Sequence, residues 1–203
     1  PSPTPVPSPR RRIDSVDVVR GLVMILMALD HTRDFFGPRV DPTNVITTTG
    51  PLFFTRWITH VCAPTFFFLT GTGAALSLGR KTTGELSRFL VTRGLWLIFL
   101  ELVVVRSLGL QFNFDYDTTI LEVIWALGWA MIALAAFVWL PRKAIAAISL
   151  TLIAGHNLLD GIRSTNPFWV FLHRPGFLVP PPGHVVFAAY PIVPWIGVTA
   201  IGF

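Results

Sequence analysis

Four ionisable residues lie close together near the end of the first long apolar stretch, namely Asp30, His31, Arg33 and Asp34. A histidine with a carboxylate one helical turn away can act as a general base whose imidazolium form is stabilised. Asp34 stands three positions after His31 and would share its helix face, whereas Asp30 would point about 100° away. The alternative is a solvated polar helix end without chemistry. We expect a catalytic centre of His31, Asp34 and Asp30.

A second histidine lies in another apolar stretch, Trp57-Ile-Thr-His60-Val-Cys-Ala-Pro64. His60 would lie at a depth similar to that of His31 and could complete the same site, or it could be a buried neutral residue bonded to a carbonyl. The histidines match no metal-ligand spacing such as HExxH, so no metal is expected. The single cysteine of the chain, Cys62, excludes an internal disulfide and is interpreted as a packed thiol.

Three arginines are candidates for binding an anionic ligand. Arg20 lies on the helix stripe of His31, eleven positions before it and therefore about 16 Å away along the axis. Ionisable residues at membrane depth are costly, so this stripe should face the protein interior. Arg93, in a later apolar stretch, could bind phosphate together with Arg20 and Arg88. Glu101 shares a helix face with Arg93, and a structural ion pair with a neighbouring helix is as good an interpretation for either residue.

The elements that carry these residues are predicted to be membrane helices. The chain has 203 residues, of which 52% are hydrophobic and 13% charged, about half the charged fraction of a soluble domain. The net charge of +5 comes from short basic clusters at 10–12, 80–88 and 142–143 that alternate with apolar runs. This is the positive-inside pattern of membrane proteins and argues against a nucleic-acid surface.

The apolar runs predict an all-α, polytopic transmembrane helix bundle with five complete spans and the start of a truncated sixth. Residues 1–11 form a disordered Pro-rich tail, and the positive-inside rule places it in the cytoplasm. Pro64 should kink the second span. The segments 33–51 and 160–187 would lie outside, with His173 and His184 solvated. The expected spans are 14–32, 52–78, 86–108, 118–140, 144–159 and the stretch from 188 onward.

Three motifs carry a resemblance to a known family. The first is Arg12-Ile-Asp14-Ser-Val-Asp17-Val-Val-Arg20-Gly21 followed by Met24-Ile-Leu-Met27-Ala-Leu-Asp30-His31. The others are Ala63-Pro64-Thr-Phe-Phe-Phe-Leu-Thr70-Gly71 and Tyr190-Pro-Ile-Val-Pro194-Trp195-Ile-Gly197. Together they resemble the heparan-alpha-glucosaminide N-acetyltransferase-like membrane family, with residues 12–203 as its transmembrane acyltransferase domain.

The resemblance implies a multi-helix enzyme that moves an acyl group, usually acetyl from acetyl-CoA, onto a sugar-type acceptor across the membrane. His31 or His60 would supply the outward histidine of such an enzyme, and Arg33 or Asn157 could stabilise the oxyanion. A bacterial inner-membrane location, membrane lipid as a partner and a homo-oligomer are the accompanying expectations. The alternative is a transporter or channel with a polar intramembrane pathway, or a scaffold without chemistry.

Overall fold

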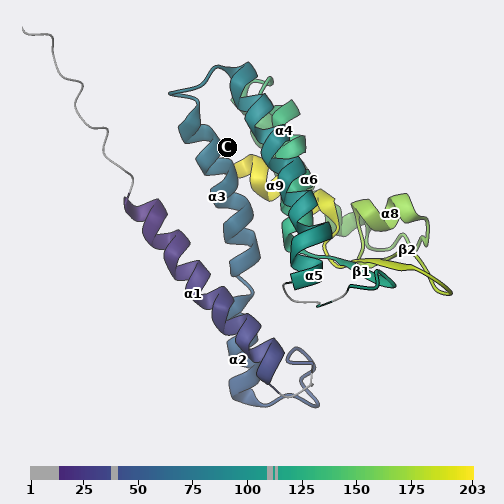
Figure 1. The fold of residues 1–203 in the computed structure, drawn as a ribbon. Coiled ribbons are helices and arrows are strands. Elements are labelled where there is room, and N and C mark those ends of the chain that lie inside the picture. The colour runs from purple at the N-terminus through teal and green to yellow at the C-terminus, as the bar shows by residue number, and fades with distance from the viewer. Residues whose placement is uncertain (1–13, 38–40, 109–111, 113) are drawn as a thin grey trace, which may run out of the picture. The chain divides into compact units, whose positions relative to one another are not determined.

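The computed structural model describes residues 14–37, 41–108, 112 and 114–203, which form mainly helices (Figure 1). The tail predicted for residues 1–11 lies outside the described residues. The chain divides between Cys62 and Ala63 into two compact units, which are taken in turn.

The first unit contains the helices α1 (Asp14–Phe36) and α2 (Gly50–Thr59), which run antiparallel. Helix α1 covers the first predicted span, 14–32, and continues for four more residues. Pro51 opens α2, where its missing N–H is not needed. Asp30 contacts α2. Val23 stands seven residues before Asp30 on α1, and its carbonyl oxygen lies 3.8 Å from the thiol of the buried Cys62. The two helices therefore meet along the side of α1 that contains Val23, its one buried residue.

The second predicted span, 52–78, is interrupted by a turn at His60 and Val61 between α2 and α3 (Cys62–Ser77). Pro64 explains the interruption, because a proline ring clashes with the carbonyl four residues earlier, here that of His60. The break lies just before Pro64, where the sequence predicts a kink. Among the described residues, the stretch Gly50–Ser77 is long and apolar enough to cross a membrane, judged by length and composition.

The second unit is built on the helices α4 (Thr83–Phe99), α6 (Val123–Phe137), α7 (Arg142–Gly155) and α9 (Ile192–Gly202). Helix α4 starts with a capping box, in which Thr82 accepts from the Glu85 amide while Glu85 Oε2 accepts from the Thr82 amide at 2.8 Å. These bonds, led by the backbone one, hold the pKa of Glu85 below its ordinary value of 4.5. Pro141 and Pro191 occupy the N-cap positions of α7 and α9.

Small residues set the distances between these helices. A Cβ added to Gly94 would lie 2.5 Å from the Gly128 carbonyl oxygen, and one added to Gly128 would lie 2.7 Å from the Gly94 carbonyl oxygen. Helices α4 and α6 therefore cross in backbone contact at this glycine pair. Gly71 on α3 lies against the Thr199 carbonyl on α9. Fully buried core side chains include Phe67, Leu86, Leu90, Leu134 and Ile192.

Helix α4 continues into a π-helix, η1 (Leu100–Val105), and a short helix, α5 (Arg106–Leu108). In the π-helix the Arg106 amide donates to the Glu101 carbonyl, five residues back. Residues five positions apart are separated by about 140° in an α-helix, whereas the wider π turn brings them toward one side. Glu101 and Arg106 are accordingly both buried, with 1% and 2% of their surface exposed.

A three-stranded sheet corrects the expectation of an all-helical chain. Strands β1 (Thr118–Leu121), β2 (Gly176–Val179) and β3 (Val185–Ala188) have the order β1-β3-β2, with β1 parallel and β2 antiparallel to β3. The span predicted for 118–140 therefore begins as a β-branched strand paired with Val185–Ala188. The outward segment 160–187 likewise contains structure, namely β2, most of β3 and the helix α8 (Pro167–Leu172) (Figure 1).

The described helices are shorter than most of the predicted spans. Helices α6 and α9 are apolar but have 15 and 11 residues, against about 20 for a full crossing. Helix α7 has 14 residues and is followed by a 3₁₀ turn, η2 (His156–Leu159). The helical class is thus confirmed, whereas five complete crossings stay a prediction.

Candidate functional site

Asp30 is the centre of a polar network that joins α1 to α2. Its carboxylate forms an ion pair with Arg33 at 2.7 Å and accepts hydrogen bonds from Arg56 at 2.9 Å and from the Thr59 hydroxyl at 2.6 Å. The side chains of Asp30 and Arg33 are 14% and 12% exposed, and Thr59 is buried. A carboxylate with three donors, two of them cationic, is a strongly held anion.

The two predicted histidines are next in sequence to two members of this network. His31 directly follows Asp30 on α1, and His60 directly follows Thr59 at the end of α2. Asp30 and Thr59 are hydrogen-bonded to each other. The residues that follow them, His31 and His60, therefore lie at a similar height along the α1–α2 pair. His31 is partly buried, His60 is exposed, and neither imidazole has a recorded hydrogen-bond or ion-pair partner among the described residues.

Asp34 lies elsewhere than expected. Its Oδ1 accepts from the Arg33 guanidinium at 2.7 Å, so it does not orient His31, and its side chain is 56% exposed. The predicted inward stripe is also turned, because Met24 is 58% exposed while the less exposed positions of α1 are centred on Val23. Arg33 bridges both carboxylates, and its Nη1 atom is buried without a hydrogen-bond partner. A donor left unpaired in this way can take an oxyanion.

Sequence reasoning missed Arg56 and Thr59 as members of the site. Arg56 stands in the apolar context Phe53-Phe54-Thr-Arg56-Trp57, where a charge needs a partner. That signal was present in the sequence. It could not name Asp30, which is 26 positions away in the chain.

The arginines expected to bind the donor lie on α1 and α4. Arg20 is partly buried and lies 3.9 Å from Asp17, which takes part of its charge. Arg88 and Arg93 are exposed on α4, and the Arg93 guanidinium lies 5.6 Å from the centre of the Phe89 ring. Arg93 shares an open, exposed surface of α4 with Thr92, Leu95, Trp96 and Phe99. A guanidinium beside an aromatic and aliphatic surface fits the phosphates and the apolar arm of an acyl-CoA.

Glu101 and Arg106 form a second buried polar group. Glu101 Oε1 accepts a hydrogen bond from the Glu122 backbone amide at 3.2 Å. Arg106 donates to the Thr118 carbonyl at 2.9 Å and lies 3.5 Å from the centre of the Tyr116 ring. Glu101 Oε2 and Arg106 Nε are buried without a hydrogen-bond partner. Arg106 thus holds the start of β1, and Glu101 holds Glu122, which lies between β1 and α6.

His173 corrects the expectation of a solvated residue. Its side chain is 1% exposed, and Nε2 lies 3.1 Å from Asp160 Oδ1. The Trp169 ring lies 4.9 Å away and the His156 ring 6.4 Å away. The short helix α8 brings the chain back toward η2, and His173, which directly follows α8, is buried there. His184, the other outward histidine, lies 3.5 Å from the Thr119 hydroxyl.

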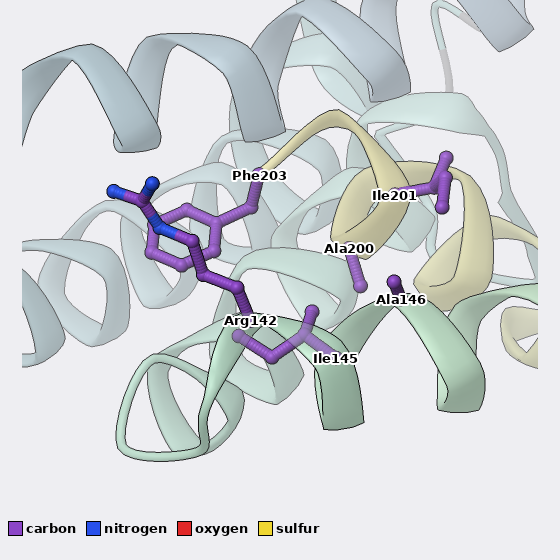
Figure 2. Close-up of a pocket in the computed structure, with 6 residues that line it drawn as sticks. All are labelled: Arg142, Ile145, Ala146, Ala200, Ile201 and Phe203. Carbon is purple, nitrogen blue, oxygen red and sulfur yellow. The ribbon is translucent and has the colours of Figure 1, made fainter.

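Two further observations concern the size of a cavity and the arrangement of side chains that bind metal ions. A cavity of about 50 Å³ lies between α7 and the end of α9, and Figure 2 shows the residues that line it, namely Arg142, Ile145, Ala146, Ala200, Ile201 and Phe203. It could hold a water molecule or two but no acyl-CoA. Within the described residues, no group of three or more His, Cys, Asp or Glu side chains is arranged to hold a metal ion.

A mainly helical chain with a membrane-length apolar helix and ionisable side chains among its apolar residues has the character of a membrane-associated enzyme. The comparison with family models agrees. Residues 12–203 match the model described as "Heparan-alpha-glucosaminide N-acetyltransferase, catalytic", and the chain belongs to this family. It is an acetyltransferase-type membrane enzyme, and the family in general uses acetyl-CoA as the donor and a sugar-type acceptor. Comparisons with curated proteins and with solved structures gave no match.

Proposed function

We propose that this chain transfers an acyl group, in the first place acetyl, from acyl-CoA at the cytoplasmic side to a sugar-type acceptor at the outer side of a bacterial inner membrane. Family membership over residues 12–203 supports the reaction class and favours it over a transporter. The basic clusters support a multi-pass topology with five spans and a cytoplasmic N-terminus. Membrane lipid surrounds the chain in this proposal, and a homo-oligomer is compatible with it.

The observation that carries the residue assignment is the Asp30 network. It fixes α1 against α2 where His31 and His60 leave the helix pair. In the proposal His31 takes the proton from the acceptor hydroxyl or amine as that atom attacks the thioester carbonyl, and His60 is the second candidate for this role. Asp30 and Asp34 supply negative charge near the resulting imidazolium, and the free Nη1 of Arg33 faces the developing oxyanion.

The donor is assigned to the arginines of the cytoplasmic half. Arg93 and the exposed apolar surface beside it match an acyl-CoA in charge and apolar character, and Arg88 lies five positions nearer the start of the same helix. Arg20 on α1 is the third candidate. The thiol of the departing CoA takes up the proton that the acceptor loses, so the overall transfer with a hydroxyl acceptor is balanced without a further reactant.

The test is acetyl-CoA turnover by the full-length protein in liposomes, measured as release of the CoA thiol with glucosamine or glucose as the acceptor. Wild type should release thiol, and His31→Ala or His60→Ala should lower the rate by about a hundredfold or more. Asp17→Asn, at an exposed ion pair on the same helix, is the control and should retain activity. Absence of thiol release together with solute flux through the liposomes would reject the enzyme in favour of the transporter.

A further inference from the structure

Two turns of the second unit lie side by side because α4 and α6 pack closely and antiparallel (Figure 1). Beyond the glycine crossing described above, the Ser87 hydroxyl donates to the Ala135 carbonyl at 2.8 Å. A Cβ added to Gly84 would lie 3.8 Å from the Trp139 ring. A step back along α4 therefore corresponds to a step forward along α6. The turn before α4 and the turn after α6 accordingly lie at the same end of this helix pair.

Four cations gather at this end, which we call the basic end. Arg80 and Lys81 stand in the turn before α4, and Arg142 and Lys143 are the first two residues of α7. Lys81 is half-buried and the other three are exposed, and no ion pair is recorded for any of them in the part of the chain that the structure describes. The dipole of α7 adds positive potential beside Arg142 and Lys143, because both stand in its first turn.

The helices that carry the basic end contain little negative charge to neutralise it. Glu85 is the only acidic residue in the stretches 63–100 and 123–159. Its Oε2 accepts from the Thr82 amide at 2.8 Å and from the Thr82 hydroxyl at 3.0 Å, so it is engaged in the capping box of α4. One carboxylate among four cations leaves the basic end with a net positive charge that an anionic ligand can neutralise.

Exposed apolar side chains accompany these cations. Trp139 and Leu140, in the turn after α6, are 64% and 40% exposed. The Lys81 Nζ atom lies 5.0 Å from the centre of the exposed Phe89 ring, so this ammonium lies on the flank of α4 and not in the water beyond the turn. Tryptophan together with basic side chains is typical of the headgroup level of a membrane.

We infer that the basic end binds an anionic phospholipid, with its phosphodiester between the two turns and Trp139 at the level of the headgroup. The inference rests on the proposed topology, which places both turns at the cytoplasmic surface, and it is independent of the acyl-transfer reaction. Each Lys or Arg near an anionic membrane surface contributes about fivefold in binding, equivalent to about 1 kcal/mol. A lipid fits better than a soluble phosphate, because its acyl chains would cover Trp139 and Leu140.

The test is tryptophan fluorescence of the full-length protein in phosphatidylcholine vesicles that also contain phosphatidylglycerol. One lipid or the other carries bromine on its acyl chains as the quencher, and subtraction of the Trp139→Phe signal isolates Trp139. In wild type, about tenfold less brominated phosphatidylglycerol than brominated phosphatidylcholine should give the same quenching. Arg142→Gln/Lys143→Gln should reduce this preference to about twofold or less, because two of the four charges are lost.

Two further double variants complete the test. Arg80→Gln/Lys81→Gln changes the other turn and should cause a similar loss, and it serves in place of the first variant if that one does not fold. Arg163→Gln/Arg174→Gln removes the same charge from two exposed arginines of the outward segment. This control should keep the preference of wild type.

Three outcomes would overturn the inference. They are an absence of phosphatidylglycerol preference in wild type, an equal loss in the control variant, and an unchanged preference in Arg142→Gln/Lys143→Gln together with a raised KM for acetyl-CoA. The last outcome would assign the basic end to the phosphates of the acyl donor. Because lipid preference is measured without turnover, this inference and the proposed acyl transfer can fail separately.

Discussion

The Thr59 hydroxyl donates a 2.6 Å hydrogen bond to Asp30 across 29 positions of sequence and so joins the end of α2 to α1. Each of these two residues is followed directly by a histidine. The contact therefore decides where His31 and His60 lie, although neither histidine takes part in it. Substitutions in the network should change both the stability of the helix pair and the placement of the proposed base.

Asp30→Asn should destabilise the protein by about 1.5–3 kcal/mol, because an amide cannot accept from Arg33, Arg56 and Thr59 together. The measurement is the thermal midpoint in detergent. Asp17→Asn removes a 3.9 Å ion pair whose side chains are 43% and 58% exposed, and it should have almost no effect. Equal shifts in the two variants would show that the Asp30 network does not join α1 to α2.

Gly94→Ala should destabilise the protein by about 1–3 kcal/mol, because the added methyl group would lie 2.5 Å from the Gly128 carbonyl oxygen and force α4 and α6 apart. Gly155→Ala is a suitable control, since a Cβ at Gly155 meets nothing within 4 Å. Chemical denaturation of both variants beside wild type gives the difference. An unchanged Gly94→Ala protein would contradict the close crossing.

Glu85 gives a stability term that depends on pH. Hydrogen bonds from Thr82 lower the pKa of Glu85 in the folded chain below its ordinary value of 4.5. The stabilisation is therefore complete above that value and is lost as the pH falls through the lower, folded pKa. The thermal midpoint of wild type should exceed that of Glu85→Gln near pH 7, and the difference should shrink below about pH 4.5. A difference that is constant from pH 7 to pH 3 would contradict this account.

Two substitutions of Glu101 should differ in their effects. Glu101→Ala leaves the Glu122 amide without its acceptor and should cost about 1–3 kcal/mol. Glu101→Gln keeps that acceptor and removes a buried charge whose second oxygen has no partner, so it should be neutral or stabilising. Thermal midpoints of the two variants in the same detergent make the comparison. A larger loss for Gln than for Ala would mean that the charge itself is needed.

Much of the helical framework could be predicted from the sequence. Apolar runs and basic clusters predicted segments that overlap α1, α4, α6, α7 and α9, and Pro64 lies beside the interruption between α2 and α3. The sheet could not be predicted in this way. Thr118–Leu121 continues directly into an apolar run, and its parallel partner Val185–Ala188 lies 67 residues further along. No local pattern records such a pairing.

The candidate site could likewise be predicted only in part from the sequence. The types and spacing of Asp30 and His31 indicated chemistry, and the structure places Asp30 at the centre of a network. A single helix could not decide which carboxylate faces a partner, because that depends on where α2 packs. For this reason Asp34 was expected to contact His31 and instead bonds Arg33. His173 looked like a loop residue because its burial comes from Trp169 and Asp160, on either side of a turn that the sequence did not reveal.

The π-helix at Leu100–Val105 affects the whole continuous helix formed by α4, η1 and α5. It holds one residue more than an α-helical turn would, so the faces before and after it differ in phase by about 100°. The glycine crossing at Gly94 and the anchoring of β1 by Arg106 can therefore each keep a favourable orientation, although no uniform α-helix would satisfy both. Deleting one residue, for example Val103, would restore a uniform helix and rotate Arg106 away from the Thr118 carbonyl while leaving the seam at Gly94 untouched. The parts of the helix before and after the π-helix thus present different faces to their neighbours, and the offset between these faces depends on one additional residue.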